Sequence, residues 1–130
     1  MIFMVILILL NLILARLMKK KIALLGSTGS IGVNALKVIR DISESYEIVN
    51  LSGNMNADIM IQQCKEFQPK SIVMINEEAS ELVRKGLSGH DINVLSGRKN
   101  LLNISKYVSI LLYFKTNDIC SCVICSIKFK

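Results

Sequence analysis

Residues 22–32 have the sequence IALLGSTGSIG, which is the strongest indication of the fold in this chain. Its first four residues form a continuous apolar run, which is typical of a strand buried on both faces of a parallel sheet. Glycines follow in the spacing G-x-x-G-x-x-G, and they permit a tight turn and close approach of a phosphate to the backbone. A helix that starts near Ser30 would point free backbone N–H groups at the same place. The stretch therefore predicts a strand, a phosphate-binding turn and a helix, with added hydroxyl donors at Ser27, Thr28 and Ser30.

The sequence that follows alternates between strand-like and helix-like patterns. Three more strands are predicted from short apolar runs, at 47–51, 71–75 and 92–95. Three helices are predicted from apolar residues at helical spacing, at 31–42, 57–67 and 77–85. This alternation predicts the α/β class: a Rossmann-like parallel sheet with helices on both faces, incomplete at the C-terminal side. Ligands bind such sheets at the carboxyl ends of the strands, so we expect a site at the glycine turn and at the end of the second strand.

Composition excludes several classes of protein. With 52% hydrophobic residues, the 130-residue chain is too apolar to be intrinsically disordered, and its four cysteines are too few for a disulfide scaffold. The net charge of +6 comes from the two ends, because residues 19–97 carry nine basic and nine acidic residues. A nucleic-acid groove would gather Lys and Arg on a folded face with aromatic residues between them. We therefore expect no nucleic-acid partner.

Residues 1–17 form an apolar extension. Of the first 18 residues, 16 are hydrophobic, yet a bilayer span needs about 20 apolar residues. A secretory signal carries its positive charge before the apolar run, whereas Lys19, Lys20 and Lys21 follow this one. Three interpretations stay open: a start placed upstream of a true first residue at Met18, a membrane anchor or targeting segment, and an additional buried helix.

The end of the second predicted strand bears on the choice of cofactor. NAD-binding folds place an Asp or Glu there, which bonds the ribose 2′-hydroxyl. The residues here, NLSGNMN at 50–56, include no carboxylate to repel a 2′-phosphate, and no Arg or Lys to pair with one. We therefore predict NADPH as the cofactor. The competing interpretation is a tight strand-to-helix turn that binds no ligand.

Five segments of the chain form one recognisable set. They are KKIALLGSTGSIG at 20–32, ALKVIR at 35–40, QCKEFQPK at 63–70, EEAS at 77–80 and VLSG at 94–97. In this order and spacing they resemble the N-terminal, NADPH-binding domain of the 1-deoxy-D-xylulose-5-phosphate reductoisomerase family. The resemblance covers about residues 18–103. We take these residues as one dinucleotide-binding domain between the extension at 1–17 and an unmatched tail at 104–130.

The resemblance implies an NADPH-dependent enzyme of non-mevalonate isoprenoid biosynthesis. Such an enzyme isomerises and reduces 1-deoxy-D-xylulose 5-phosphate to 2-C-methyl-D-erythritol 4-phosphate, with Mg²⁺ or Mn²⁺ on the substrate, and the full-length family is expected to be homodimeric. By motif match, the cofactor-binding residues are Thr28, Gly29, Ser30, Ile31, Asn54, Met55 and Asn56. Asn54 and Met55 depart from the family's usual Gly and Lys or Arg.

The family's later motifs have no counterpart in this sequence. Its Asn-Lys-Glu segment, its acidic metal ligands and its substrate-binding residues are all missing, so we predict no catalytic and no metal-ligating residue here. The chain resembles a fragment that is inactive on its own. Two other functions stay open: a non-enzymatic, membrane-tethered nucleotide-binding module, and half of another NADP-dependent oxidoreductase.

The cysteines do not predict a metal site. Cys120, Cys122 and Cys125 have the spacing C-x-C-x-x-C, but a structural zinc site needs four ligands. Cys64 falls on a core-facing helix position, and the single histidine, His90, falls in a predicted loop. We therefore expect reduced cysteines and a cytoplasmic protein. An organelle or a membrane is the alternative location if residues 1–17 are a targeting segment or an anchor.

Overall fold

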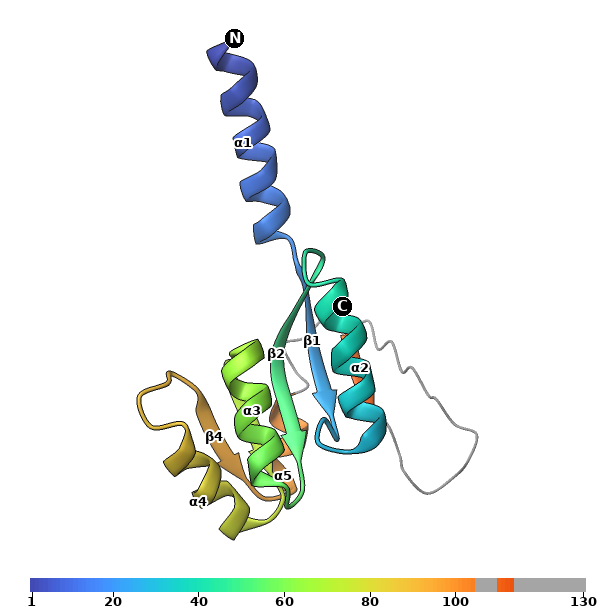
Figure 1. Ribbon diagram of the computed structural model, residues 1–130, viewed down its shortest axis with the longest axis vertical. Helices are drawn as coiled ribbons and strands as arrows, with labels where there is room; N and C mark the ends of the chain where they lie inside the picture. Colours follow the sequence, from blue (N-terminus) through green and yellow to red (C-terminus); the bar gives the residue numbers. More distant parts are fainter. Residues whose placement is uncertain (105–109, 114–130) are drawn as a thin grey trace.

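The computed structural model describes residues 1–104 and 110–113. Five strands are present in this part of the chain: β1 (Lys20–Leu25), β2 (Tyr46–Gly53), β3 (Ser71–Met74), β4 (Asn93–Ser96) and β5 (Ile110–Tyr113). The helices there are α1 (Ile2–Leu17), α2 (Ser30–Asp41), α3 (Ala57–Phe67), α4 (Glu77–Gly86) and α5 (Lys99–Ile104). All strand pairs are parallel, and the strand order is β4-β3-β2-β1-β5. Figure 1 labels three of these strands, β1, β2 and β4.

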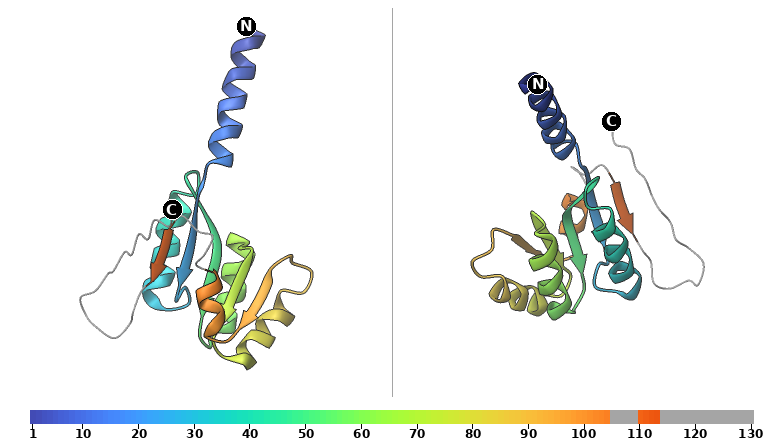
Figure 2. Two further views of the ribbon diagram at one scale, coloured as in Figure 1. Left: turned by 180° about the vertical axis from the view of Figure 1, so that it is seen from behind. Right: turned by 45° about the horizontal axis from the view of Figure 1, so that its top comes forward.

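Helices cover both faces of the sheet. Helices α2, α3 and α4 lie on one face in Figure 1, and the view from behind in Figure 2 shows α5 on the other. This confirms the predicted Rossmann-like parallel sheet. Strand β1 lies between β2 and β5, so the strand order reverses beside it. In open α/β sheets the ligand crevice lies at such a reversal, at the carboxyl ends of the strands.

The core lies between the sheet and the helices α2, α3 and α4. The largest side chains that are fully buried include Leu24 of β1, Leu51 of β2 and Met60 of α3. Cys64 of α3 is also buried, as its helical position predicts, and it is a free thiol. Burial raises the pKa of Cys64 to about 12, because the thiolate would lose its hydration.

Two elements lie beyond those that we predicted. Helix α5 spans only six residues, which is too short to show a helical stripe. Strand β5 lies in the tail that we could not match, and it pairs in parallel with β1, with Ile22 opposite Ile110. Its place in the sheet depends on that distant partner, which no local pattern reveals. Cys120, Cys122 and Cys125 lie outside the described residues, and the division at 17/18 and 103/104 stays a prediction.

The extension at 1–17 is helical and stands away from the sheet (Figures 1 and 2). Its large apolar side chains from Met1 to Leu14 are between 49% and 108% exposed, so the described part of the chain does not bury this helix. The three interpretations of the extension stay predictions. Among the described helices, none is both long and apolar enough to cross a membrane.

Candidate functional site

The glycine turn after β1 uses its three glycines differently. Gly26 has a φ of +76°, in the left-handed region that favours glycine. A Cβ at Gly32 would lie 2.2 Å from the Gly26 carbonyl oxygen, so only glycine lets α2 pack this closely on the turn. At Gly29, by contrast, φ is −75° and a Cβ would meet only that same oxygen at 3.6 Å. The fold therefore requires glycine at positions 26 and 32. It does not require glycine at position 29.

Two neighbouring elements hold the turn in place. Strand β2 contributes Ser52, whose carbonyl accepts from the Ser27 amide at 2.8 Å and whose hydroxyl accepts from the Gly26 amide at 3.1 Å. Helix α3 contributes Gln63, whose Nε2 donates to the Ser27 carbonyl at 2.8 Å. Ser27 is fully buried, and its hydroxyl donates to the Ser52 carbonyl at 3.3 Å. The predicted role of the Ser27 hydroxyl as a donor to a ligand is therefore wrong, because that hydroxyl holds the turn to β2.

A cavity of about 450 Å³ lies against this turn, at the carboxyl ends of the strands. Its lining residues come from the glycine turn, from the ends of β2 and β3, and from the segment after β4: Leu25, Gly26, Thr28, Gly29, Ile31, Gly32, Ser52, Gly53, Asn54, Ile75, Arg98 and Leu101. The glycine turn and the end of β2 approach closely at Gly53, which has no Cβ. A Cβ there would lie 3.0 Å from the Thr28 side chain. The sequence expectation of a site at this edge of the sheet agrees with the position of the cavity.

The N-terminus of α2 differs from those of the next two helices. The side chain of Asn56 caps α3 by accepting from the Ile59 amide at 3.2 Å, and that of Asn76 caps α4 by accepting from the Ala79 amide at 2.8 Å. The N-cap of α2 is Gly29, which has no side chain to do so. First-turn N–H groups have no partner within a helix and carry a partial positive charge. Those of α2 stay available to an anion in the cavity.

Four of the seven predicted cofactor-binding residues line the cavity, namely Thr28, Gly29, Ile31 and Asn54. The other three are not among the lining residues. Ser30 is exposed, Met55 is 67% exposed, and the Asn56 side chain caps α3. Their contact with a cofactor stays a prediction.

Some lining residues follow β3 and β4, and these were not predicted from the sequence. Ile75 follows β3, while Arg98 and Leu101 follow β4, and among the described residues Arg98 is the one charged residue that lines the cavity. The rule that ligands bind at the carboxyl ends of strands applies to every strand of the sheet. Applied to β3 and β4 as well as to β1 and β2, it would have pointed to these residues.

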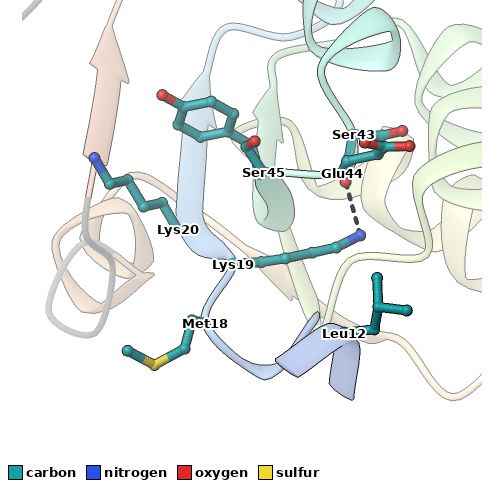
Figure 3. A pocket seen from close by; sticks show the side chains of 8 residues that line it. Leu12, Met18, Lys19, Lys20, Ser43, Glu44 and Ser45 are labelled. Atoms are coloured by element: carbon teal, nitrogen blue, oxygen red, sulfur yellow. Dashed lines mark hydrogen bonds between the residues drawn. The ribbon is translucent and has the colours of Figure 1, made fainter. Parts of the chain in front are cut away.

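A second hollow, of about 960 Å³, lies at the opposite end of the sheet. It is bounded by α1, the start of β1 and the loop before β2, and Figure 3 shows its side chains. There the Lys19 ammonium donates to the Ser43 carbonyl at 2.7 Å. This hollow lies at the amino ends of the strands and has no glycine turn, so it does not have the features of a nucleotide site.

Among the described residues, neither the cavity at the glycine turn nor the hollow beside α1 contains a cluster of catalytic or metal-binding side chains. Within residues 1–104 and 110–113, no three His, Cys, Asp or Glu side chains lie close enough to hold a metal ion. His90 is exposed in the loop between α4 and β4. The arrangement as described can bind an anionic, nucleotide-like ligand, and it offers no group placed for acid–base chemistry.

Comparison with known proteins identifies the family. The family model of 1-deoxy-D-xylulose 5-phosphate reductoisomerase matches residues 22–114. The chain belongs to the 1-deoxy-D-xylulose 5-phosphate reductoisomerase family. This confirms the resemblance found in the sequence, and the match continues past residue 103 through β5.

Individual reductoisomerases agree with this assignment. That of Caldanaerobacter subterraneus subsp. tengcongensis is 43% identical over 88 residues, which cover 68% of this chain and 23% of the relative. That of Halothermothrix orenii is 41% identical over 88 residues, with the same coverage. The chain thus spans about a quarter of the length of the reductoisomerases that it matches.

Solved reductoisomerase structures have the same fold. The Zymomonas mobilis reductoisomerase in complex with NADPH matches with a TM-score of 0.68 and 21% identity, over 72% of this chain and 25% of that one. A reductoisomerase in complex with NADPH, fosmidomycin and magnesium matches with a TM-score of 0.65 and 32% identity, over 71% of this chain and 23% of that one.

Proposed function

We propose that the chain is the NADPH-binding N-terminal portion of a reductoisomerase that converts 1-deoxy-D-xylulose 5-phosphate to 2-C-methyl-D-erythritol 4-phosphate. The cavity at the glycine turn is the observation that carries this proposal, because the uncapped start of α2 and the unconstrained Gly29 both border it. Family membership supports the proposal. So do the related reductoisomerases that were solved with NADPH.

In this proposal each part of the turn has a defined task. The first-turn N–H groups of α2 donate to the pyrophosphate of the cofactor, and Gly29 lets that pyrophosphate approach the backbone. The Thr28 side chain packs at the end of β2, and Ile31 provides an apolar wall. NADPH bound here would supply the hydride for the reduction.

The described residues do not fit the divalent cation that the family uses. The absence of a suitable cluster of His, Cys, Asp or Glu among residues 1–104 and 110–113 leaves no candidate ligand set there. We therefore propose that this part of the protein binds the cofactor, and that isomerisation and reduction require groups from elsewhere in the enzyme. On this basis the 130-residue chain binds NADPH without turning over the substrate.

The proposal is tested by titrating the full chain with NADPH. Nicotinamide fluorescence and calorimetry measure the binding affinity. We expect saturable binding, and Gly29→Ala should weaken it by about tenfold, equivalent to about 1.4 kcal/mol, because the added methyl group borders the phosphate path. Ser88→Ala, an exposed change in the loop after α4, is the control and should leave the affinity unchanged. A folded chain that binds no NADPH, or measurable reductoisomerase activity from this chain alone, would contradict the proposal.

We also propose an association of α1 with a membrane surface. The exposure of its apolar side chains on all sides favours this, since a helix that is apolar all round is normally buried in protein or lipid. Lys19, Lys20 and Lys21 follow it and would attract anionic headgroups. Co-sedimentation with anionic lipid vesicles tests the proposal, with the chain starting at Met18 as control. Equal sedimentation of the two chains would exclude an association of α1 with the membrane surface. For a chain without this association, we propose a cytoplasmic location.

A further inference from the structure

The second strand-to-helix turn provides no cation for a 2′-phosphate. Asn54 is neutral, Met55 is an exposed thioether, and the Asn56 side chain is engaged as the cap of α3. The two turns that meet at the cavity, at the ends of β1 and β2, therefore contribute hydroxyl, amide and backbone groups but no positive side chain. A cofactor with a phosphate on its ribose would need its charge balanced from elsewhere.

Backbone hydrogen bonds bring the later turns to the same edge. The Asn76 amide after β3 donates to the Asn54 carbonyl at 3.2 Å, and the Gly97 amide after β4 donates to the Met74 carbonyl at 3.0 Å. The turns that follow β2, β3 and β4 thus lie side by side, in agreement with the order of these strands in the sheet. This arrangement places the residue after Gly97 at the rim that also contains Asn54.

The segment around Arg98 is fixed by local contacts. Gly97 has a φ of +86°, which turns the chain sharply at the end of β4. The Asn100 side chain donates to the Ser96 carbonyl at 2.7 Å, and the Leu101 amide donates to the Arg98 carbonyl at 3.2 Å. These bonds hold the Arg98 backbone at the cavity while its side chain stays exposed.

The charge of Arg98 is not used inside the described part of the chain. The ion pairs found there join Arg40 to Glu66 and Arg84 to Glu81. Within residues 1–104 and 110–113, Arg98 is also the one charged residue of the cavity lining. A guanidinium presents a planar set of donors that matches a phosphate with two parallel hydrogen bonds. A phosphate group is therefore the ligand chemistry that suits this position.

We propose that Arg98 binds the 2′-phosphate of NADPH and sets the preference of this chain for NADPH over NADH. It would take the place of a cation on the turn after β2. This inference rests on the proposed function, because it assumes that the cavity holds a dinucleotide.

The test measures the affinity of the full chain and its variants for NADPH and NADH, and for the smaller probes 2′,5′-ADP and ADP. Arg98→Gln should weaken NADPH and 2′,5′-ADP by about 10- to 100-fold, as loss of a charged hydrogen-bonding pair does. NADH and ADP should change by less than about twofold, since they lack the 2′-phosphate. Lys99→Gln is the matched control, because Lys99 is an exposed neighbour outside the lining, and it should leave all four affinities unchanged.

The variant Arg98→Lys keeps the charge but loses the paired donors, so its loss of NADPH affinity should be smaller than that of Arg98→Gln. Equal weakening of NADPH and NADH by Arg98→Gln would overturn the inference, as would unchanged affinity for NADPH. A wild-type chain that binds NADPH and NADH equally would overturn the inference and leave the proposed function standing. A wild-type chain that binds neither nucleotide would overturn both.

Discussion

The turns that follow β1 and β2 both lead from a strand into a helix, yet they are built in opposite ways. The first turn is tight, is hydrogen-bonded from β2 and α3, and ends in an N-cap that has no side chain. In the second turn the chain closes its own helix, because Asn56 satisfies an amide of α3. The backbone N–H groups at the start of a helix can thus be bonded by a side chain of the same chain, which contributes to stability, or be left available to a ligand. Variants in the two turns should separate these uses.

The largest effect is expected at Gly32, where the first turn touches α2. Gly32→Ala would place a Cβ 2.2 Å from the Gly26 carbonyl oxygen and 2.7 Å from the Cα of Ser27, both backbone atoms that cannot rotate away. We expect the free energy of unfolding to fall by about 3 kcal/mol or more, measured by urea unfolding with circular dichroism. Gly29→Ala, which has room for its methyl group, should cost less than about 1 kcal/mol. Equal losses in the two variants would break the distinction between the required and the unconstrained glycine.

A smaller decrease in the free energy of unfolding is expected when the hydrogen bond from α3 to the glycine turn is removed. In Gln63→Met the Ser27 carbonyl loses its donor, and an unsatisfied buried polar group costs about 1–3 kcal/mol. The loss should fall toward the lower end, because the buried Gln63 Oε1 has no hydrogen-bond partner in the described part of the chain and disappears in the same change. NADPH affinity should fall as well, since the turn loses its position. Gln62→Met, an exposed change on the same helix, is the control, and equal behaviour of the two variants would exclude a role for Gln63.

The next largest change in the free energy of unfolding is expected from the N-cap of α3 in the second turn. Asn56→Ala should lower the free energy of unfolding by about 1 kcal/mol, which is the usual cost of losing an Asn cap. Asn76→Ala in α4 should behave alike, because it removes the same kind of bond. Asn54→Ala removes no cap and should leave stability unchanged in urea unfolding. A loss from Asn54→Ala as large as that from Asn56→Ala would show that the cap is not what stabilises this turn.

The smallest effect is expected where the two helices meet on the surface. Arg40 of α2 pairs with Glu66 of α3, and both side chains are about half exposed. The pair raises the pKa of Arg40, through its hydrogen bond to Glu66 and then through its charge. Exposed pairs contribute little, so Arg40→Gln should change the urea midpoint less than Asn56→Ala does. A larger change would mean that the contact between α2 and α3, more than the turns, sets stability.

Sequence reasoning recovered the elements whose signal is local. Buried apolar runs predicted β1 to β4, and stripes at helical spacing predicted α2, α3 and α4 close to their observed bounds. It did not recover α5 or β5. The first is too short to show a period, and the second is the run ILLY, which becomes a strand of this sheet only by pairing with β1.

The same limit applies to the site. The spacing of Gly26, Gly29 and Gly32 is a local signal, so the phosphate-binding turn could be predicted. Arg98 lies 72 positions after Gly26 in the sequence, and it reaches the cavity because the sheet places β4 beside β3 and β3 beside β2. That order is a property of the whole sheet, which no single segment of the sequence reveals.

The pairing of β1 with β5 has a consequence for the order in which the fold is completed. In β1, Ile22 lies opposite Ile48 of β2, which follows it by 26 positions in the sequence (48 − 22), and opposite Ile110 of β5, which follows it by 88 (110 − 22). Contacts of such long sequence separation are costly in loop entropy and form late. During translation, the strand that carries the glycine turn therefore keeps one edge open after β2, β3 and β4 have emerged. A nucleotide that binds at the glycine turn before β5 arrives would therefore bind before the sheet is complete.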